Sequence, residues 1–125
     1  MATSFGTYFK ELRLKRGLSL RNFSEKHGYD PGNISRVERG VFPPPESPQK
    51  LREYAKALAL KQGSDEWLEF FDRAAAVRGQ IPADLRGDEK LISRLPLLFR
   101  TLRGGKVTPE RLNQLVDILR REHSD

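Results

Sequence analysis

Most of the side chains best suited to chemistry lie between residues 19 and 39, and that chemistry is the recognition of bases and phosphates. On a helix in the major groove, Arg36 could pair with guanine O6 and N7, and Asn33 with adenine N6 and N7. Other polar or cationic side chains suit phosphate oxygens, although each could equally be a solvated surface residue: Lys10, Ser19, Arg21, Lys26, Ser35 and Arg39. The segment therefore favours binding to double-stranded DNA.

Two short helices are needed to position these side chains. Ser19 is a good N-cap for the first helix, and Gly28 can adopt the left-handed conformation that ends it. Asp30 is placed to cap the second helix, with Pro31 at the first helical position, where no N–H is needed. Residues that recur at helical spacing would face the core: Leu20, Phe23, Ser24, Ile34 and Val37.

The rest of the chain also shows helical patterns. Cap signals that begin further helices stand at Ser4, Ser47, Ser64, Asp88 and Thr108. Pro96 is expected to kink the sixth helical stretch or to divide it in two. No alternation typical of strands is present, so we expect an all-α protein with six or seven helices.

Residues 5 to about 60 resemble the Cro/phage-repressor type of helix-turn-helix domain, which has the lambda-repressor-like fold of the XRE family. The resemblance is carried by residues 9–13 (FKELR), 17–19 (GLS), Gly28 at the turn and, above all, 34–40 (ISRVERG). It implies a five-helix DNA-binding domain followed by a helical C-terminal extension. We place the DNA-binding domain at residues 1–63 and the extension at 64–125.

The resemblance also implies roles for individual residues. It places Asp30, Pro31 and Gly32, with Asn33 and Arg36, at base edges, and Ser19, Arg21 and residues 40–41 near the phosphate backbone. It further implies a partly buried ion pair between Arg13 and Glu38. The sequence departs from the family at Leu20, where Gln is frequent, and at Ser24, where Ala is usual. Because Pro31 and Gly32 have no side-chain donor, direct reading should rest on Asn33 and Arg36, with DNA shape supplying the rest.

The net positive charge is concentrated in the half of the chain that contains this motif. The chain carries +6, of which residues 1–60 hold +5, from 11 Lys and Arg against 6 Asp and Glu. Residues 61–125 hold +1, from 12 against 11. A basic surface can also be merely solvated, but its coincidence with the helical motif strengthens the prediction of DNA binding.

The near-neutral extension offers an interface for a second copy. Domains of this type bind as dimers to half-sites about 34 Å apart, so two copies must be held together. We predict a homodimer; the alternative is that these helices only pack on their own domain. The aromatic cluster could also stack bases, but at helical spacing it favours a core or an interface. Candidate dimer or core residues are Trp67, Phe70, Phe71, Leu98, Phe99, Leu115 and Leu119.

Several classes of protein are disfavoured by composition. There is no apolar run long enough to cross a membrane and no secretion signal at the start, so we expect a cytoplasmic protein. With no cysteine and two distant histidines, no metal or cofactor is expected. Ser24, His27 and Asp30 could be drawn as a catalytic triad, but a helix, its end and an N-cap explain them, so no catalytic residue is predicted.

The leading hypothesis is a transcriptional regulator that represses by occluding RNA polymerase at an inverted-repeat operator. A second hypothesis is an antitoxin or operon controller whose C-terminal helices bind an operon-encoded partner protein. A third is an interaction adaptor that keeps the fold without binding DNA. Loss of operator binding in Arg36→Ala with the fold intact would separate the first from the third.

Overall fold

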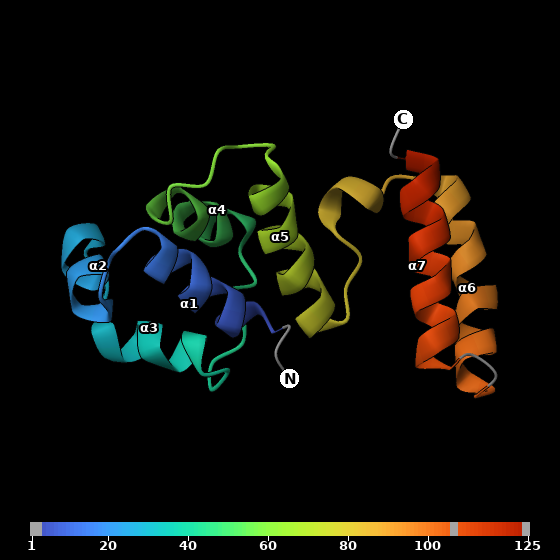
Figure 1. The fold of residues 1–125 in the computed structure, drawn as a ribbon, viewed down its shortest axis with the longest axis horizontal. Coiled ribbons are helices and arrows are strands. Elements are labelled where there is room, and N and C mark those ends of the chain that lie inside the picture. The colour runs from blue at the N-terminus through green and yellow to red at the C-terminus, as the bar shows by residue number, and fades with distance from the viewer. Residues whose placement is uncertain (1–3, 106–107, 124–125) are drawn as a thin grey trace. The chain divides into compact units, whose positions relative to one another are not determined.

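The computed structural model describes residues 4–105 and 108–123, and the described part is all-helical, as expected. Within α7, the side chains of four residues lie outside the description, among them that of the interface candidate Leu119. The elements, in order, are α1 (Phe5–Lys15), α2 (Leu20–His27), α3 (Pro31–Glu38), α4 (Pro48–Ala57), α5 (Asp65–Arg78), the short 3-10 helix η1 (Ala83–Leu85), α6 (Glu89–Arg103) and α7 (Pro109–His123) (Figure 1).

Local capping explains where the helices begin. The side-chain oxygens of Ser4, Ser19 and Asp30 accept the backbone N–H three residues ahead, which satisfies one of the donors left open in the first turn. Ser47, Ser64 and Asp88 do the same for α4, α5 and α6, and Thr108 for α7. All seven cap signals in the sequence are therefore used.

The chain forms two compact units, residues 1–82 and 83–125. In the first unit α1 contacts α3 and α5, α2 contacts α3, and α4 contacts α5. With α5 included, this unit has the five helices that the resemblance implies (Figure 1). The boundary differs from the expected one after residue 63, because α5 contributes to the core of the first unit.

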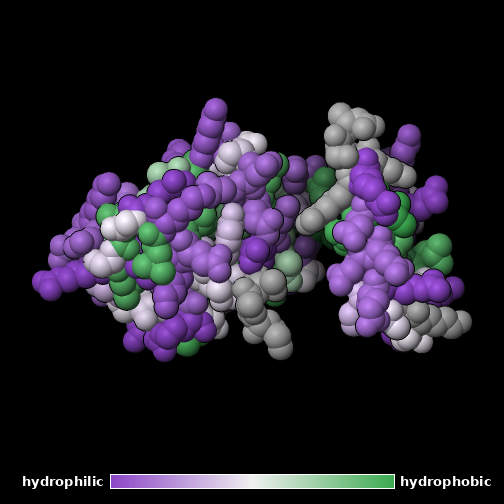
Figure 2. Space-filling view, viewed as in Figure 1, coloured by the Kyte–Doolittle hydropathy of each residue, from purple (hydrophilic) through white to green (hydrophobic). Residues whose placement is uncertain are grey.

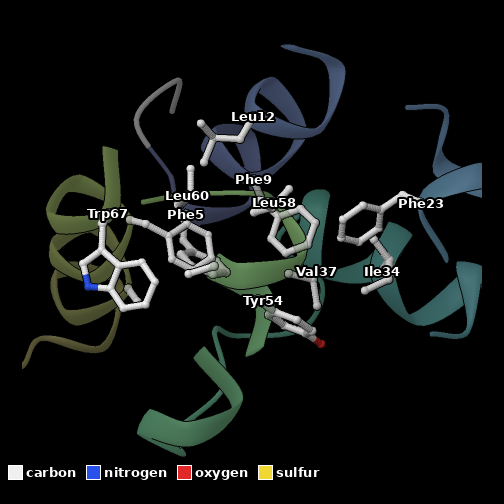
Figure 3. Packing of buried hydrophobic residues seen from close by; sticks show 13 residues of the cluster. Phe5, Phe9, Leu12, Phe23, Ile34, Val37, Tyr54, Leu58, Leu60 and Trp67 are labelled. Atoms are coloured by element: carbon white, nitrogen blue, oxygen red, sulfur yellow. The ribbon is translucent and has the colours of Figure 1, made fainter. Parts of the chain in front are cut away.

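The core of the N-terminal unit is aromatic and is formed by all five of its helices (Figure 3). Phe9 of α1 is fully buried and packs edge-on against Phe23 of α2 and Tyr54 of α4, with ring centres 5.7 and 5.4 Å apart. The ring centre of Phe70 of α5 lies 4.8 Å from that of Phe5. Each such buried ring stabilises the fold by about 1.5–3 kcal/mol.

The three aromatic candidates on α5 lie in or against this core. Trp67 and Phe70 are buried, and Phe71 is half-buried between them and the surface. The ring centre of Phe71 lies 5.0 Å from that of Trp67 and 6.0 Å from that of Phe70. These side chains therefore act as core residues of the N-terminal unit.

A glycine permits the close approach of α1 to α3. A Cβ on Gly6 would lie 2.3 Å from the carbonyl oxygen of Val37 and 2.5 Å from that of Glu38. Both neighbours are backbone atoms, which cannot move aside cheaply. Sequence reasoning missed this residue, because nothing near Gly6 in the chain indicates the crossing.

The C-terminal unit contains α6 and α7, which form a helical hairpin (Figure 1). Pro96 lies inside α6, which remains one helix of 15 residues, so it does not divide the stretch. Leu91 and Leu95 are half-buried, and none of the side chains described in α6 and α7 is fully buried. Large apolar side chains on these helices remain 38–66% exposed: Ile92, Leu97, Leu98, Phe99, Leu102, Leu112, Leu115, Val116 and Ile118. Hydrophobic surface, coloured green, is visible on this unit among hydrophilic side chains in Figure 2.

Candidate nucleic-acid interface

The turn between α2 and α3 is built around a glycine. Gly28 has a φ of +73°, a backbone conformation that residues with a side chain adopt only with strain. The carbonyl oxygen of Ser24 accepts the N–H of Tyr29 at 2.9 Å, which closes the end of α2. The Asp30 carboxylate then accepts the N–H of Asn33 at 2.9 Å and starts α3. The two helices are thus joined by a short, locally determined turn.

One face of α3 is buried and the opposite face is open. Ile34, Val37 and Glu38 are buried, whereas Asn33 and Arg36 are exposed. Of the other candidates for base contact, Pro31 is exposed and Gly32 half-buried, while the Asp30 carboxylate is engaged in the cap. The outward side chains with free hydrogen-bonding capacity at the start of α3 are those of Asn33 and Arg36.

These two side chains contact each other. Arg36 Nη1 donates to Asn33 Oδ1 at 3.2 Å. The guanidinium carbon of Arg36 also lies 5.6 Å from the centre of the Phe42 ring, within the range of a cation–π contact. Sequence reasoning did not select Phe42, which lies in the loop beyond α3 and is 40% exposed.

The loop after α3 is held at both ends. The carbonyl oxygen of Arg36 accepts the N–H groups of Val41 and Phe42 at 2.8 and 3.1 Å. Further along, Arg78 of α5 donates to Glu46 at 3.1 Å and to the carbonyl oxygen of Pro44, which is buried. Arg78 therefore fixes the proline-rich loop that carries Phe42. It too was missed, since 32 residues separate it from Glu46 in the chain.

The candidates for phosphate contact differ in their local partners. Arg21 pairs with Glu25 at 3.3 Å on the exposed side of α2, and Arg39 donates to Ser35 Oγ at 3.1 Å. Ser19 Oγ is engaged in capping α2. Lys10 and Lys26 are exposed. An exposed pair such as Arg21–Glu25 contributes under about 1 kcal/mol, so phosphate could replace the carboxylate at little cost.

A buried ion pair fixes α3 against α1. Arg13 Nε and Nη2 donate to the two carboxylate oxygens of Glu38 at 2.7 and 2.9 Å, and Nη1 donates to the carbonyl oxygen of Leu18 at 2.9 Å. Both side chains are at most 6% exposed. This is the pair that the resemblance implies. Its bidentate geometry sets the rotation of α3 and therefore the direction in which Asn33 and Arg36 point.

Lys50 and Tyr54 of α4 pack against Tyr29, which lies in the turn between α2 and α3. The Lys50 ammonium lies 4.9 Å from the centre of the Tyr29 ring and 5.2 Å from that of Tyr54. The two rings meet edge-on, 5.2 Å apart. Burial raises the pKa of both tyrosine hydroxyls above the usual value, so both stay protonated at neutral pH.

The three residues that could be drawn as a triad do not assemble as one. Ser24 Oγ is buried without a hydrogen-bond partner, as is His27 Nε2. Asp30 instead accepts the Asn33 N–H. Ser24 lies in the core next to Phe23, where its small size matters, and the His27 ring packs 5.0 Å from that of Phe23.

Residues 4–105 and 108–123 contain no group of three or more His, Cys, Asp and Glu side chains arranged to hold a metal ion. No helix in the same ranges has the length and apolar character that a membrane crossing requires.

Comparison with known proteins supports a helix-turn-helix module. A family model described as a helix-turn-helix domain matches residues 4–67, which is just over half of the chain. The match spans α1 to α4 and the first turn of α5, including the α2–turn–α3 segment. No curated protein and no solved structure matches the chain significantly.

Proposed function

Because the chain belongs to this helix-turn-helix domain family, we propose that it is a sequence-specific transcriptional regulator that reads an operator with α3. The observation that carries the proposal is the exposed pair Asn33 and Arg36 at the start of a helix whose other face is locked in the core. A helix of this kind fits the major groove, where each base pair presents a distinct pattern of donors and acceptors.

The sequence of α3 supports a more specific assignment to the Cro/phage-repressor type. The ISRVERG run at residues 34–40 supplies the buried Ile34 and Val37, and Glu38 for the ion pair with Arg13. In this proposal Ser19, Arg21, Lys26, Ser35, Arg39 and Lys10 contact phosphate. Binding should then weaken steeply as salt rises, because each phosphate contact releases counterions.

The hairpin of α6 and α7 is proposed to join two copies. Its unit is close to the size of about 40 residues below which chains usually need a disulfide, a metal or association. The apolar side chains of α6 and α7 that remain 38–66% exposed give a second copy apolar surface to cover. A standard interface buries about 800 Å² per partner, to which the polar side chains beside them would also contribute.

A homodimer of this kind would act as a repressor in the cytoplasm. Two copies of α3 related by a two-fold axis match an inverted repeat with half-sites about 34 Å apart. A dimer seated on such an operator would exclude RNA polymerase from an overlapping promoter. The Leu98, Phe99 and Leu115 side chains, each 43–48% exposed, are the proposed contacts between copies.

Selection of DNA fragments from a random pool by the purified protein tests the proposal. We expect a palindrome whose half-sites lie one helical turn apart. Arg36→Ala should lower affinity for the selected operator by about fivefold or more while leaving the circular dichroism spectrum unchanged. Arg100→Ala, an exposed arginine of α6, is the matched control and should bind as the unaltered protein does.

Two results would contradict the proposal in different ways. If no sequence is enriched, an adaptor that does not bind DNA becomes the better interpretation. If an operator is enriched and Arg36→Ala binds it unchanged, Arg36 is not the residue that reads it. Light scattering at micromolar concentration tests the dimer, with Phe99→Glu expected to yield monomers. A protein that is monomeric both free and on DNA would contradict it.

The same exposed face supports a second candidate function. An apolar hairpin with no buried side chain among those described could instead receive an operon-encoded protein, as in an antitoxin or operon controller. Co-expression with the products of neighbouring genes distinguishes the two. A stable complex that Phe99→Glu abolishes would favour the partner protein over the second copy.

A further inference from the structure

The hydrogen bond between the two exposed side chains of α3 limits what each can read. Arg36 Nη1 donates to Asn33 Oδ1 at 3.2 Å. An asparagine that pairs with adenine needs both its amide donor and its carbonyl acceptor, because adenine presents N7 as an acceptor and N6 as a donor. Oδ1 has two lone pairs, and the Arg36 bond occupies one of them and places the positive guanidinium beside the other. A base donor such as adenine N6–H would have to approach next to that positive charge, whereas the Asn33 NH₂ group, which only donates, suits a base acceptor.

Two neighbours hold Arg36 in this position. A Cβ on Gly32 would lie 3.3 Å from Arg36 Nη1 and 3.1 Å from Asp30 Oδ2, so the guanidinium lies across the space that the glycine leaves open. On the other side, the Phe42 ring lies 5.6 Å from the guanidinium carbon. The Asn33 bond is thus one of three constraints on the same group. The Phe42 constraint depends on a loop that is tied back to α3 and to Arg78.

We propose that Asn33 and Arg36 form one donor-only reading unit that selects guanine at two adjacent base pairs. The inference rests on the proposed function and specifies what the site reads. Guanine is the base that presents two acceptors, O6 and N7, in the major groove. Residues three apart on a helix have Cβ atoms about 5–6 Å apart, close enough to reach neighbouring base pairs. Gly32 and Phe42 are positioning residues for Arg36.

This assignment differs from the adenine contact expected of an asparagine taken alone. If Asn33 and Arg36 read independently, Asn33 would favour an A·T pair, and its removal would affect one position of the site. If they form a unit, Asn33 favours a G·C pair, and its removal also frees Arg36 to reach other acceptors. The two models therefore predict different selected sequences and different effects of the same variant.

The test compares DNA fragments selected by the full chain and by Asn33→Ala. The position beneath Asn33 is identified as the one whose base preference is lost completely in Asn33→Ala. In the unaltered protein we expect a G·C pair there, and in Asn33→Ala we expect the guanine preference beneath Arg36 to fall as well, by at least about threefold. An A·T pair beneath Asn33 would overturn the inference, as would an Arg36 position that stays as selective in Asn33→Ala as before.

Asn33→Asp separates the two roles of the amide. Aspartate keeps an acceptor for Arg36 but has no donor for a base, so preference for guanine should persist beneath Arg36 and vanish beneath residue 33. Loss of both preferences, or retention of both, would contradict the unit. The fold of each variant is checked by circular dichroism and by its melting temperature.

Gly32→Ala tests the positioning of Arg36. The added methyl should displace the guanidinium and broaden the position beneath Arg36, whereas Gly104→Ala, where a Cβ meets only ordinary contacts of 3.6 and 3.7 Å, should leave the selected site unchanged. An unaltered site in Gly32→Ala would overturn the placement of Arg36. If the unaltered protein enriches no sequence, the proposed function fails; if it enriches a palindrome with A·T beneath Asn33, only the present inference fails.

Discussion

The N-terminal unit and the C-terminal hairpin use the same local signals and reach opposite states of burial. Helices in both begin at Ser, Thr or Asp caps, and both carry apolar residues at helical spacing. In the first unit Phe5, Phe9, Phe23 and Phe70 are at most 1% exposed, whereas Phe99 of the hairpin is 47% exposed. Amphipathic helices are therefore sufficient for secondary structure, but a closed core needs elements on several sides.

The difference in burial suits the two units to different tasks. In the proposed function the first unit must hold α3 rigidly, because a misplaced Arg36 guanidinium could not contact its base. A closed aromatic core and the buried Arg13–Glu38 pair hold the helix in place. The hairpin presents an apolar face, which suits a surface that another chain completes. Four sets of substitutions, from the largest expected effect to the smallest, test how the closed core of the first unit differs from the exposed parts of the chain.

The largest difference should appear between two identical substitutions. Phe9→Ala should lower the free energy of unfolding by about 3–5 kcal/mol, because it leaves a cavity in a closed core. Phe99→Ala should change the melting of the N-terminal unit little and instead weaken self-association. Thermal unfolding followed by circular dichroism, with light scattering, measures both. Equal destabilisation by the two variants would contradict the distinction between a closed core in the first unit and an open surface on the hairpin.

The buried ion pair should matter more than the exposed one on the same helix. Arg13→Ala leaves the Glu38 carboxylate buried without its partner and should cost about 3–5 kcal/mol. Lys15→Ala removes a 2.7 Å pair with Glu66 in which the lysine is 61% exposed, and should cost under about 1 kcal/mol. Urea unfolding of both variants gives the comparison. Similar urea midpoints for the two variants would show that burial of the Arg13–Glu38 pair adds nothing to stability.

Two glycine substitutions compare a helix crossing with an open helix end. Gly6→Ala places a methyl group within 2.5 Å of two carbonyl oxygens of α3 and should cost about 1–3 kcal/mol or more. Gly104→Ala at the end of α6 meets no close contact and should be nearly neutral. Because the α1–α3 crossing is strained in the first variant, its affinity for DNA should also fall. A stable Gly6→Ala protein would show that the crossing is not tight.

The smallest effect concerns Glu66 and is a function of pH. The hydrogen bond from Lys15 lowers the pKa of the Glu66 carboxyl in the folded chain below its usual 4.5. The group therefore stabilises the fold above about pH 4.5, and this contribution is lost as pH falls through the lowered folded pKa. Glu66→Gln should be less stable by under about 1 kcal/mol at pH 7. Urea midpoints should converge at lower pH; a constant difference would contradict the linkage.

Much of the α2–turn–α3 segment could be predicted from sequence because its geometry is local. Ser19, Gly28, Asp30 and Pro31 act within a few residues, and the caps and the turn formed as expected. The Arg13–Glu38 pair spans 25 residues and was available only through the resemblance. What could not be predicted depends on neighbours distant in the chain, such as the Arg78 contacts to the loop beyond α3.

The sequence by itself determined the all-α class, the helix starts and the two exposed polar side chains of α3, since these follow from capping, φ preferences and helical periodicity. Only the tertiary structure decided that α5 completes the first core, that Gly6 lies against the end of α3, and that Arg36 is held by Asn33 and Phe42. The physical reason is range: caps and periodicity act over about four residues, whereas packing joins side chains whose order in the chain says nothing about their distance.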